Sequence, residues 1–267
     1  MGNKIPPTMP RAVGEKENLM SHSASFIVTK NGVLWLPDSG NPSVLLDKET
    51  EFVRVKLSPP TGELYDIPLS KWRFLVDEYR VPEWWNVEEG ERSCREELKA
   101  WVRAHTITGD VDEITRGALR FVFAGSPKVG VNAGCIHTYG SSNPVIEENV
   151  GVIYACKSSG PVIEENTGYV CVYDSSRPII GENAGIVHAN SSSNPVIWEN
   201  TGLIETQNGS KPTIMGNKKT IKSFDNSRVV IVNNMGDVRV YGHFDPVVKK
   251  NIGCVRSLQI QGGDIDV

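Results

Sequence analysis

The stretch PVIEENTGYVCVYDSSR, residues 161–177, is one copy of a 17-residue unit that decides the fold. Its leading proline recurs at intervals of 17 residues, at Pro127, Pro144, Pro161, Pro178, Pro195 and Pro212, and Pro246 falls two periods further on. Eight such units fill residues 127–262. Self-similarity at a short fixed period is typical of solenoid proteins, in which each repeat packs on its neighbours.

Two positions of the unit carry aliphatic side chains without exception. The third reads Val129, Ile146, Ile163, Ile180, Ile197, Ile214, Ile231 and Val248, and the tenth reads Ile136, Ile153, Val170, Val187, Ile204, Ile221, Val238 and Val255. Side chains that are mostly β-branched favour extended backbone, and 17 residues are too few for two helices with their turns. Each unit is therefore predicted to form one coil of a parallel β-solenoid, with equivalent side chains stacked about 4.8 Å apart.

Asparagine and glycine mark the bends of the predicted coil. The sixth position is Asn in all eight units and the eighth is Gly in seven, with Lys219 as the exception. We expect the chain to turn at this Asn-x-Gly step, with glycine at positive φ and the asparagine amides hydrogen-bonded along the stack. Small residues at position twelve should face inward, and the serines from Ser142 to Ser227 should mark the second bend.

The residues before the repeats predict a different organisation. We expect a disordered arm at 1–23, an α+β capping domain at 24–117 and the solenoid at 118–267, so the protein as a whole should be mainly β. A hairpin is indicated around Lys30-Asn31-Gly32. Two helices are expected to follow. The first begins after Ser70, with Trp72, Leu75, Val76 and Tyr79 on one face, and the second carries Cys94, Leu98, Trp101, Val102 and His105.

Residues 67–112 carry a set of motifs in a fixed order: Trp72 and Phe74, then Val81 to Trp84, then Trp101 and His105. In this order and spacing the segment resembles an uncharacterised domain that precedes repeat segments in phage and bacterial proteins. The resemblance implies a capping role and a phage or prophage origin. It implies no catalytic residues.

Composition excludes several classes of protein. The net charge of −4 and the pI near 5.8 argue against direct binding of nucleic acid. Five cysteines without CxxC spacing argue against a disulfide framework and indicate a reducing compartment. No apolar stretch is long enough for a membrane span. We expect a cytoplasmic protein, in the host cell or virion if it is phage-encoded, without a cofactor or a metal.

Two sets of outward residues are candidates for function. The first is an acidic ladder at positions four and five, made of Glu147, Glu148, Glu164, Glu165, Glu182 and Glu199. Stacked like charges repel, so the ladder is a solvated edge, a rail for cations, or a surface that imitates a phosphate backbone for a basic partner. The second is an aromatic and apolar face at positions nine, eleven and thirteen, which either packs on the N-terminal domain or meets another protein. Its partner-binding residues would be Tyr139, Tyr154, Tyr169, Tyr173, Val152 and Ile186.

Three functions remain open at this point. The leading hypothesis is a non-enzymatic binding or assembly protein that contacts another protein, or a second copy, through the aromatic face. The second is an acidic inhibitor of a nucleic-acid-binding host protein. The third is an enzyme with a site between the cap and the first coils, near His105, Asp110 and His137.

Overall fold

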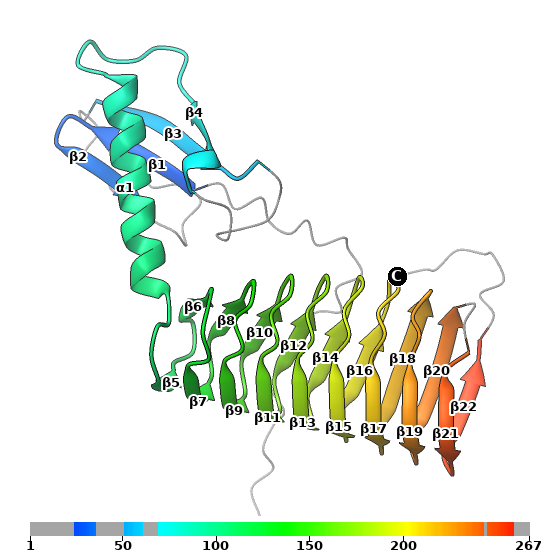
Figure 1. The fold of residues 1–267 in the computed structure, drawn as a ribbon. Coiled ribbons are helices and arrows are strands. Elements are labelled where there is room, and N and C mark those ends of the chain that lie inside the picture. Colours follow the sequence, from blue (N-terminus) through cyan, green and yellow to red (C-terminus); the bar gives the residue numbers. More distant parts are fainter. Residues whose placement is uncertain (1–23, 36–50, 61–68, 243–244, 259–267) are drawn as a thin grey trace, which may run out of the picture. The chain divides into compact units, whose positions relative to one another are not determined.

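The computed structural model describes residues 24–35, 51–60, 69–242 and 245–258, and it divides into two compact units between Arg103 and Ala104. The described part of the chain is mainly β (Figure 1). The arm expected at 1–23 lies outside the described residues.

The N-terminal unit contains a four-stranded antiparallel sheet in the order β2-β1-β3-β4. Its elements are β1 (Ala24–Thr29), β2 (Gly32–Trp35), β3 (Phe52–Ser58), a 3-10 turn (Leu69–Lys71), β4 (Arg73–Val76) and α1 (Val87–His105). The hairpin expected around Lys30-Asn31-Gly32 joins β1 to β2. Alternate residues Val53, Val55 and Leu57 of β3 are buried, so one face of the sheet carries the core of this unit.

The prediction of a first helix in this unit, beginning after Ser70, is wrong. The residues after Ser70 form β4, which pairs antiparallel with β3 and joins Val76 to Val55. Within β4 exposure alternates residue by residue, which is the period of a strand rather than a helix. Tyr79, expected on the buried helical face, is 98% exposed.

The second predicted helix is confirmed as α1. Its N-terminus is capped by Asn86, whose side-chain oxygen accepts a hydrogen bond from the backbone N–H of Glu89 at 3.0 Å. Cys94 and Leu98, one turn apart, are fully buried. Burial raises the pKa of the Cys94 thiol to about 12.

The C-terminal unit is the predicted solenoid, built from two parallel sheets of nine strands each (Figure 1). One, here called the odd sheet, contains β5 (Val111–Ile114), β7 (Lys128–Asn132), β9 (Val145–Asn149), β11 (Val162–Asn166), β13 (Ile179–Asn183), β15 (Val196–Asn200), β17 (Thr213–Asn217), β19 (Val230–Asn234) and β21 (Val247–Asn251). The other, the even sheet, contains β6 (Leu119–Val122), β8 (Cys135–Thr138), β10 (Val152–Ala155), β12 (Tyr169–Val172), β14 (Ile186–Ala189), β16 (Leu203–Thr206), β18 (Thr220–Asp225), β20 (Asp237–Gly242) and β22 (Cys254–Ser257).

Each coil contributes one strand to each sheet, and the core lies between the two sheets. In register pairs such as Ile163 with Ile180, and Ile153 with Val170, residues of equal phase stack directly. The third and tenth positions are fully buried from Ile136 to Val238. The small residues of position twelve from Thr138 to Val240, and the serines of the second bend, are buried as well, so the inward assignment made from the period is confirmed.

A chain of side-chain amides runs through the solenoid beside the aliphatic core. Each asparagine of the sixth position donates from Nδ2 to Oδ1 of the asparagine in the next coil, at 2.7 to 2.8 Å, from Asn132 to Asn251. Every interior member is both donor and acceptor. The ladder therefore satisfies buried polar groups and also fixes the register of successive coils.

We expect Asn183→Asp to destabilise the solenoid at neutral pH by several kcal/mol, since a buried carboxylate cannot donate to Asn200. Burial raises the pKa of the new carboxyl above the unfolded value of about 3.9. The variant therefore keeps most stability below that value and loses it as the pH rises through the folded pKa. Urea unfolding at acidic and neutral pH checks this, with Asn183→Ala as control. An equal pH response in both variants would contradict it.

The glycines at position eight, here called the glycine ladder, are required for a reason other than the positive φ expected from the sequence. The positive φ angles of the second bend fall instead at position fourteen, at Gly140, Lys157, Asp174, Ser191, Asn208 and Asp225. None of the glycines after the asparagines has a positive φ. A Cβ atom on Gly185 would lie 2.1 Å from the carbonyl oxygen of Gly168 in the preceding coil. Glycine is required there because the coils approach too closely for a side chain.

A ninth coil, formed by β5 and β6, precedes the eight predicted ones. Eighteen residues separate Val111 from its partner Val129, and sixteen separate Leu119 from its partner Cys135, instead of the regular 17. Ile114 takes the place of the ladder asparagine. This coil was not recognised from the 17-residue period, because its loops differ in length and because it lacks the leading proline and the asparagine. The boundary expected after residue 117 therefore falls between its two strands.

The structure also shows what covers the first coil. The backbone N–H of Ile107 donates to the carbonyl oxygen of Phe121 at 2.8 Å, and the Ile107 side chain joins the solenoid core. Residues 104–109 therefore close the N-terminal end, where a sheet edge and the core would otherwise meet water.

A fragment of residues 104–267 should accordingly remain soluble, whereas 118–267 should aggregate. The shorter fragment lacks Ile107 and β5, so the edge of β7 and the side chain of Val129 become exposed. Size-exclusion chromatography with light scattering of both fragments checks the prediction. A well-behaved 118–267 fragment would show that the residues before Ala118 are not needed as a cap.

Candidate functional site

The acidic ladder lies on the outer face of the odd sheet, as the period predicts. Glu148, Glu165, Glu182 and Glu199 are register partners in β9, β11, β13 and β15. Glu147 and Glu164 precede the first two in the chain and are exposed. At strand spacing of about 4.8 Å these carboxylates repel one another. Their cost to the folding free energy is reduced by water and by cations at the two ends.

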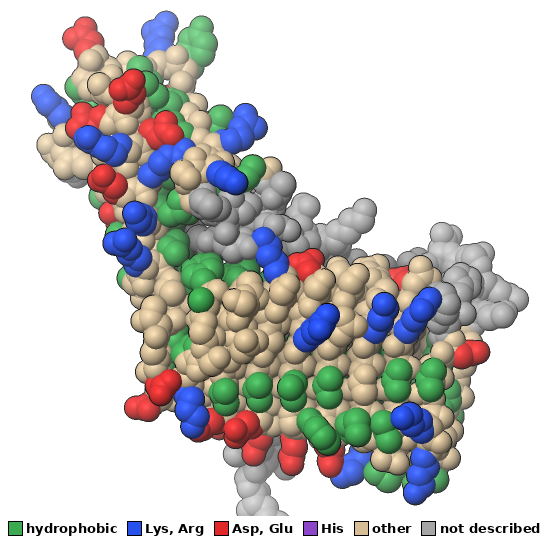
Figure 2. Space-filling model, in the orientation of Figure 1, with side chains coloured by type: hydrophobic (Ala, Val, Ile, Leu, Met, Phe, Trp, Pro, Cys, Tyr) green, Lys and Arg blue, Asp and Glu red, His purple; other side chains and the backbone are tan. Residues whose placement is uncertain are grey.

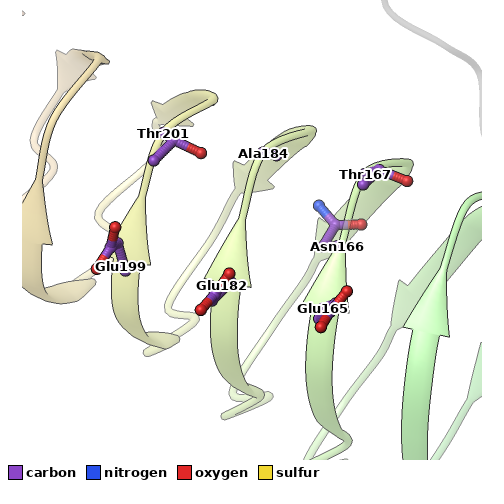
Figure 3. Close-up of a pocket in the computed structure, with 7 residues that line it drawn as sticks. All are labelled: Glu165, Asn166, Thr167, Glu182, Ala184, Glu199 and Thr201. Atoms are coloured by element: carbon purple, nitrogen blue, oxygen red, sulfur yellow. The ribbon is translucent and has the colours of Figure 1, made fainter.

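Lysines close both ends of this ladder. Lys128 Nζ lies 3.3 Å from Glu147 Oε1, and Lys218 forms an ion pair with Glu199. The carboxylates of Glu165 and Glu182 lie between these ends. Figure 3 shows Glu165, Glu182 and Glu199 along successive strands, with Thr167, Ala184 and Thr201 forming a second row beside them. The two rows line a shallow groove that presents carboxylate and hydroxyl oxygens.

The groove does not provide a recognisable catalytic or metal centre. No group of three or more His, Cys, Asp or Glu side chains within the described ranges is placed to hold a metal ion. The groove lining contains carboxylates, hydroxyls and one buried ladder asparagine, but no side chain that would serve as a nucleophile with its base.

The aromatic face lies on the outer side of the even sheet. Tyr154 and Tyr169 are half-buried, and Tyr139 is only 5% exposed. The rings stack along the coils, with 4.6 Å between the ring centroids of His137 and Tyr154. The remaining predicted partner-binding residues of this face, Val152, Tyr173 and Ile186, are half-buried too.

The ninth coil extends this face in a way that the period did not predict. Phe123 stacks on Tyr139 with 5.5 Å between ring centroids, and Phe121 lies 5.9 Å from His137. The aromatic rows therefore begin one coil earlier than expected. The side chains within them already contact one another closely, so a large part of their apolar area is covered within the chain.

Burial also lowers the reactivity of the ionisable side chains on this face. Desolvation raises the pKa of the Cys135 thiol to about 12, and it raises the pKa of Tyr173 above its ordinary value. With this pKa, Cys135 is almost wholly protonated at neutral pH. Since the thiolate is the reactive form of cysteine, its reactivity is low. Neither side chain is an activated nucleophile.

A second apolar surface, which the sequence analysis missed, lies on the outer face of the odd sheet. Position two of the unit is aliphatic in six coils, at Val145, Val162, Ile179, Val196, Val230 and Val247. Trp198, Met215 and Val232 of position four lie beside this row. Ile179 is 42% exposed, Trp198 57% and Val247 58%. Figure 2 shows these hydrophobic rows running across the strands, with acidic side chains toward the β5 end.

The signal for this odd-sheet apolar surface was present in the sequence. The second position is aliphatic nearly as regularly as the third, with Lys128 and Thr213 as exceptions. A strand buried on one face only would alternate apolar and polar residues, whereas positions two and three are both apolar. That excess of apolar residues over the needs of the core is what indicates an outward contact surface.

Asp110 and His137, two of the residues named for the enzyme hypothesis, both belong to the solenoid. Asp110 precedes β5 of the odd sheet, where its carboxylate accepts a hydrogen bond from the backbone N–H of Lys128 at 2.8 Å. His137 lies in β8 of the even sheet and stacks between Phe121 and Tyr154. The two residues occupy different sheets, and each has a structural role.

Comparison with known proteins identifies no relative. No family model, no curated protein and no solved structure matches the chain. In the described part of the chain, no helix is both long enough and apolar enough to cross a membrane.

Proposed function

We propose that this chain is a non-enzymatic protein-binding or assembly protein, and that the outer face of the odd sheet is its contact surface. The observation that carries the proposal is the apolar surface of this sheet, formed by the position-two row with Trp198, Met215 and Val232. Ile179, Trp198 and Val247 within it are exposed, and the other members are half-buried. A contiguous apolar surface rimmed by charges is typical of protein interfaces.

The fold suits such a surface to binding. The side chains stand on parallel strands whose register is fixed by the core and by the asparagine ladder. A surface that is already ordered loses little conformational entropy when a partner binds, so more of the interaction free energy contributes to affinity. Trp198, large and more than half exposed, is the residue type that most often dominates an interface.

These observations bear on two of the hypotheses drawn from the sequence, the aromatic contact face and the acidic inhibitor. The aromatic face remains a predicted partner surface, but Tyr139 and Cys171 within it are at most 5% exposed. A phosphate-imitating surface would be uniformly acidic. Here the glutamates end at Lys218 and stand beside Trp198 and Met215, which favours a protein partner over the imitation of nucleic acid.

Two triple variants test the proposal by removing one face at a time. The first changes Ile179, Trp198 and Met215 to Ser, and the second, as the matched control, changes Tyr154, Tyr169 and Tyr173 to Ser. We expect the first variant to self-associate more weakly in light scattering and to retain less protein from a bacterial lysate. The loss of binding free energy should be roughly 2 kcal/mol or more. The second should keep both.

The alternatives give different results. If the odd-sheet variant associates and retains proteins as wild type does, the proposal is overturned. Loss confined to the tyrosine variant would assign binding to the aromatic face. Retention that disappears at high salt, and that does not need Trp198, would assign it to the acidic ladder.

A further inference from the structure

We infer that the occupant of the odd-sheet face is a second copy of this chain, packed face to face with its stack of coils antiparallel to the first. This inference rests on the proposed function and adds the identity and orientation of the partner. It is drawn from the order of charges along the stack.

Charge on the odd sheet is divided between its two ends. Strands β9 to β15 carry the six glutamates of the acidic ladder. Strands β17, β19 and β21 contain no Asp or Glu, and the lysines Lys218, Lys249 and Lys250 lie in or directly after them. Figure 2 shows acidic side chains toward the β5 end of this face and basic ones at the β21 end.

A two-fold axis that runs parallel to the strands, midway between the two packed sheets and opposite β15, matches these ends to each other. β21 lies three strands beyond β15 and β9 lies three strands before it, so β21 of one copy faces β9 of the other. Lys249 and Lys250 are then level with the partner's Glu147 and the partner's Glu148. Lys218, which follows β17, is level with β13 and the partner's Glu182.

The same axis places the apolar residues on one another. Because rotation about the strand direction leaves that direction unchanged, the position-two row of one copy meets the same row of the other. Val196 and Trp198 of β15 lie at the centre, where the residues that dominate an interface usually cluster. Two sheets packed in this way lie about 10 Å apart with their side chains interdigitated.

The area available is sufficient for a reversible dimer. Seven strands from β9 to β21 span about 29 Å, and a five-residue strand is about 17 Å long. Their product is on the order of 500 Å² per copy, or about 1,000 Å² in total, which is at the lower limit for specific interfaces. The dimer should therefore dissociate on dilution.

Other modes of self-association leave the charges unmatched. A two-fold axis along the stack sets the glutamates of both copies level with one another, and the lysines likewise. End-to-end pairing through β21 or β22, the last strands of the two sheets, brings Lys249, Lys250 and Arg256 near their own copies. Lysine on an edge strand is a known means of preventing such pairing.

Charge reversal followed by mixing tests the antiparallel arrangement directly. The variants K249E/K250E and E147K/E148K should each self-associate at least about tenfold more weakly than wild type, because like charges then face each other. In an equimolar mixture both contacts become attractive, and the heterodimer should form with an affinity near that of wild type. Sedimentation velocity at low salt measures all three samples.

The matched control is E164K/E165K, which makes the same change on β11. That strand faces β19 of the partner, where the outward residues are the uncharged Val232 and Asn233. Mixing this variant with K249E/K250E should not restore wild-type affinity. Full restoration would overturn the proposed register, and failure of the first mixture to associate would overturn the antiparallel arrangement.

Failure of this inference is distinguishable from failure of the proposed function. A wild-type protein that stays monomeric at high concentration, yet loses retention of another protein in the triple Ser variant of the odd sheet, overturns the dimer and supports the binding function. If the triple variant changes neither self-association nor retention, both proposals are overturned.

Discussion

Replacement of Ile163 by Asp is expected to abolish soluble folding. Ile163 is fully buried in β11 and stacks between Ile146 and Ile180 of the adjacent coils. The substitution removes an aliphatic side chain and buries a carboxylate among the hydrocarbon side chains of the core. The loss is expected to exceed about 5 kcal/mol, which is comparable to the whole stability of many domains. Soluble yield and thermal unfolding measure it.

Val162→Asp is the matched control for this experiment. Val162 is the neighbouring residue of the same strand, but it lies on the outer face and is only half-buried. The control should fold with a small change in stability, since its carboxylate remains in water. Equal behaviour of the two variants would show that the inward and outward positions of the coil are misassigned.

Gly185→Ala is expected to destabilise the solenoid by about 3 kcal/mol or more. The added methyl group would lie 2.1 Å from the Gly168 carbonyl oxygen, which belongs to backbone and cannot move alone. The coils must separate, which weakens the 2.9 Å hydrogen bonds from Gly185 to Asn166 and from Ile186 to Gly168. Overpacking and weakened hydrogen bonds together give this magnitude.

The one natural exception shows how a coil responds to such a side chain. Where Lys219 replaces the glycine, the hydrogen bond from Thr220 N–H to the Gly202 carbonyl is 3.3 Å long, instead of the 2.9 Å found between Ile186 and Gly168. The coils open locally at this point. The comparison supports close approach as the reason for glycine.

Gly209→Ala separates the two explanations of the glycine ladder. Gly209 has a φ of +77°, and nothing lies within 4 Å of an added Cβ, so its cost should be only about 1 to 2 kcal/mol of backbone strain. If Gly185→Ala costs no more than Gly209→Ala in urea unfolding, close approach of the coils is not the reason for the ladder.

The fold of the repeat region could be predicted because its constraints recur in every coil. A position such as Ile163 or Asn183 has identical residues above and below it, so one inference is tested seven or eight times along the sequence. The ninth coil escaped prediction because it lacks the proline and the asparagine that recur in the other coils. Its Ile114 and its altered loop lengths became interpretable only through its pairing with β7.

The N-terminal unit was harder to predict for a physical reason. The residues around Trp72 satisfy a helical spacing and a strand alternation about equally over a short segment. Pairing with β3, which is distant in sequence, decides between them. The role of the glycine ladder was likewise hidden, because positive φ and close backbone approach both select glycine.

Only part of the candidate site followed from sequence. The acidic ladder lies where its phase predicts, because carboxylates at position five must point outward. The apolar surface around Trp198 was missed because aliphatic residues at position two suit a β-strand whether they face the core or the solvent. Their exposure distinguishes them, and exposure depends on which side of the strand each residue occupies.

Sedimentation velocity of wild type beside Trp198→Asp, over a wide range of protein concentration at low salt, tests the central claim most directly. Trp198 points outward and is more than half exposed, so the variant should fold as wild type does in circular dichroism. We predict that the wild-type sedimentation coefficient rises with concentration to that of a dimer, while the variant stays monomeric. Identical behaviour of the two proteins, whether both associate or both remain monomeric, would contradict the assignment of the odd-sheet face as the surface of self-association.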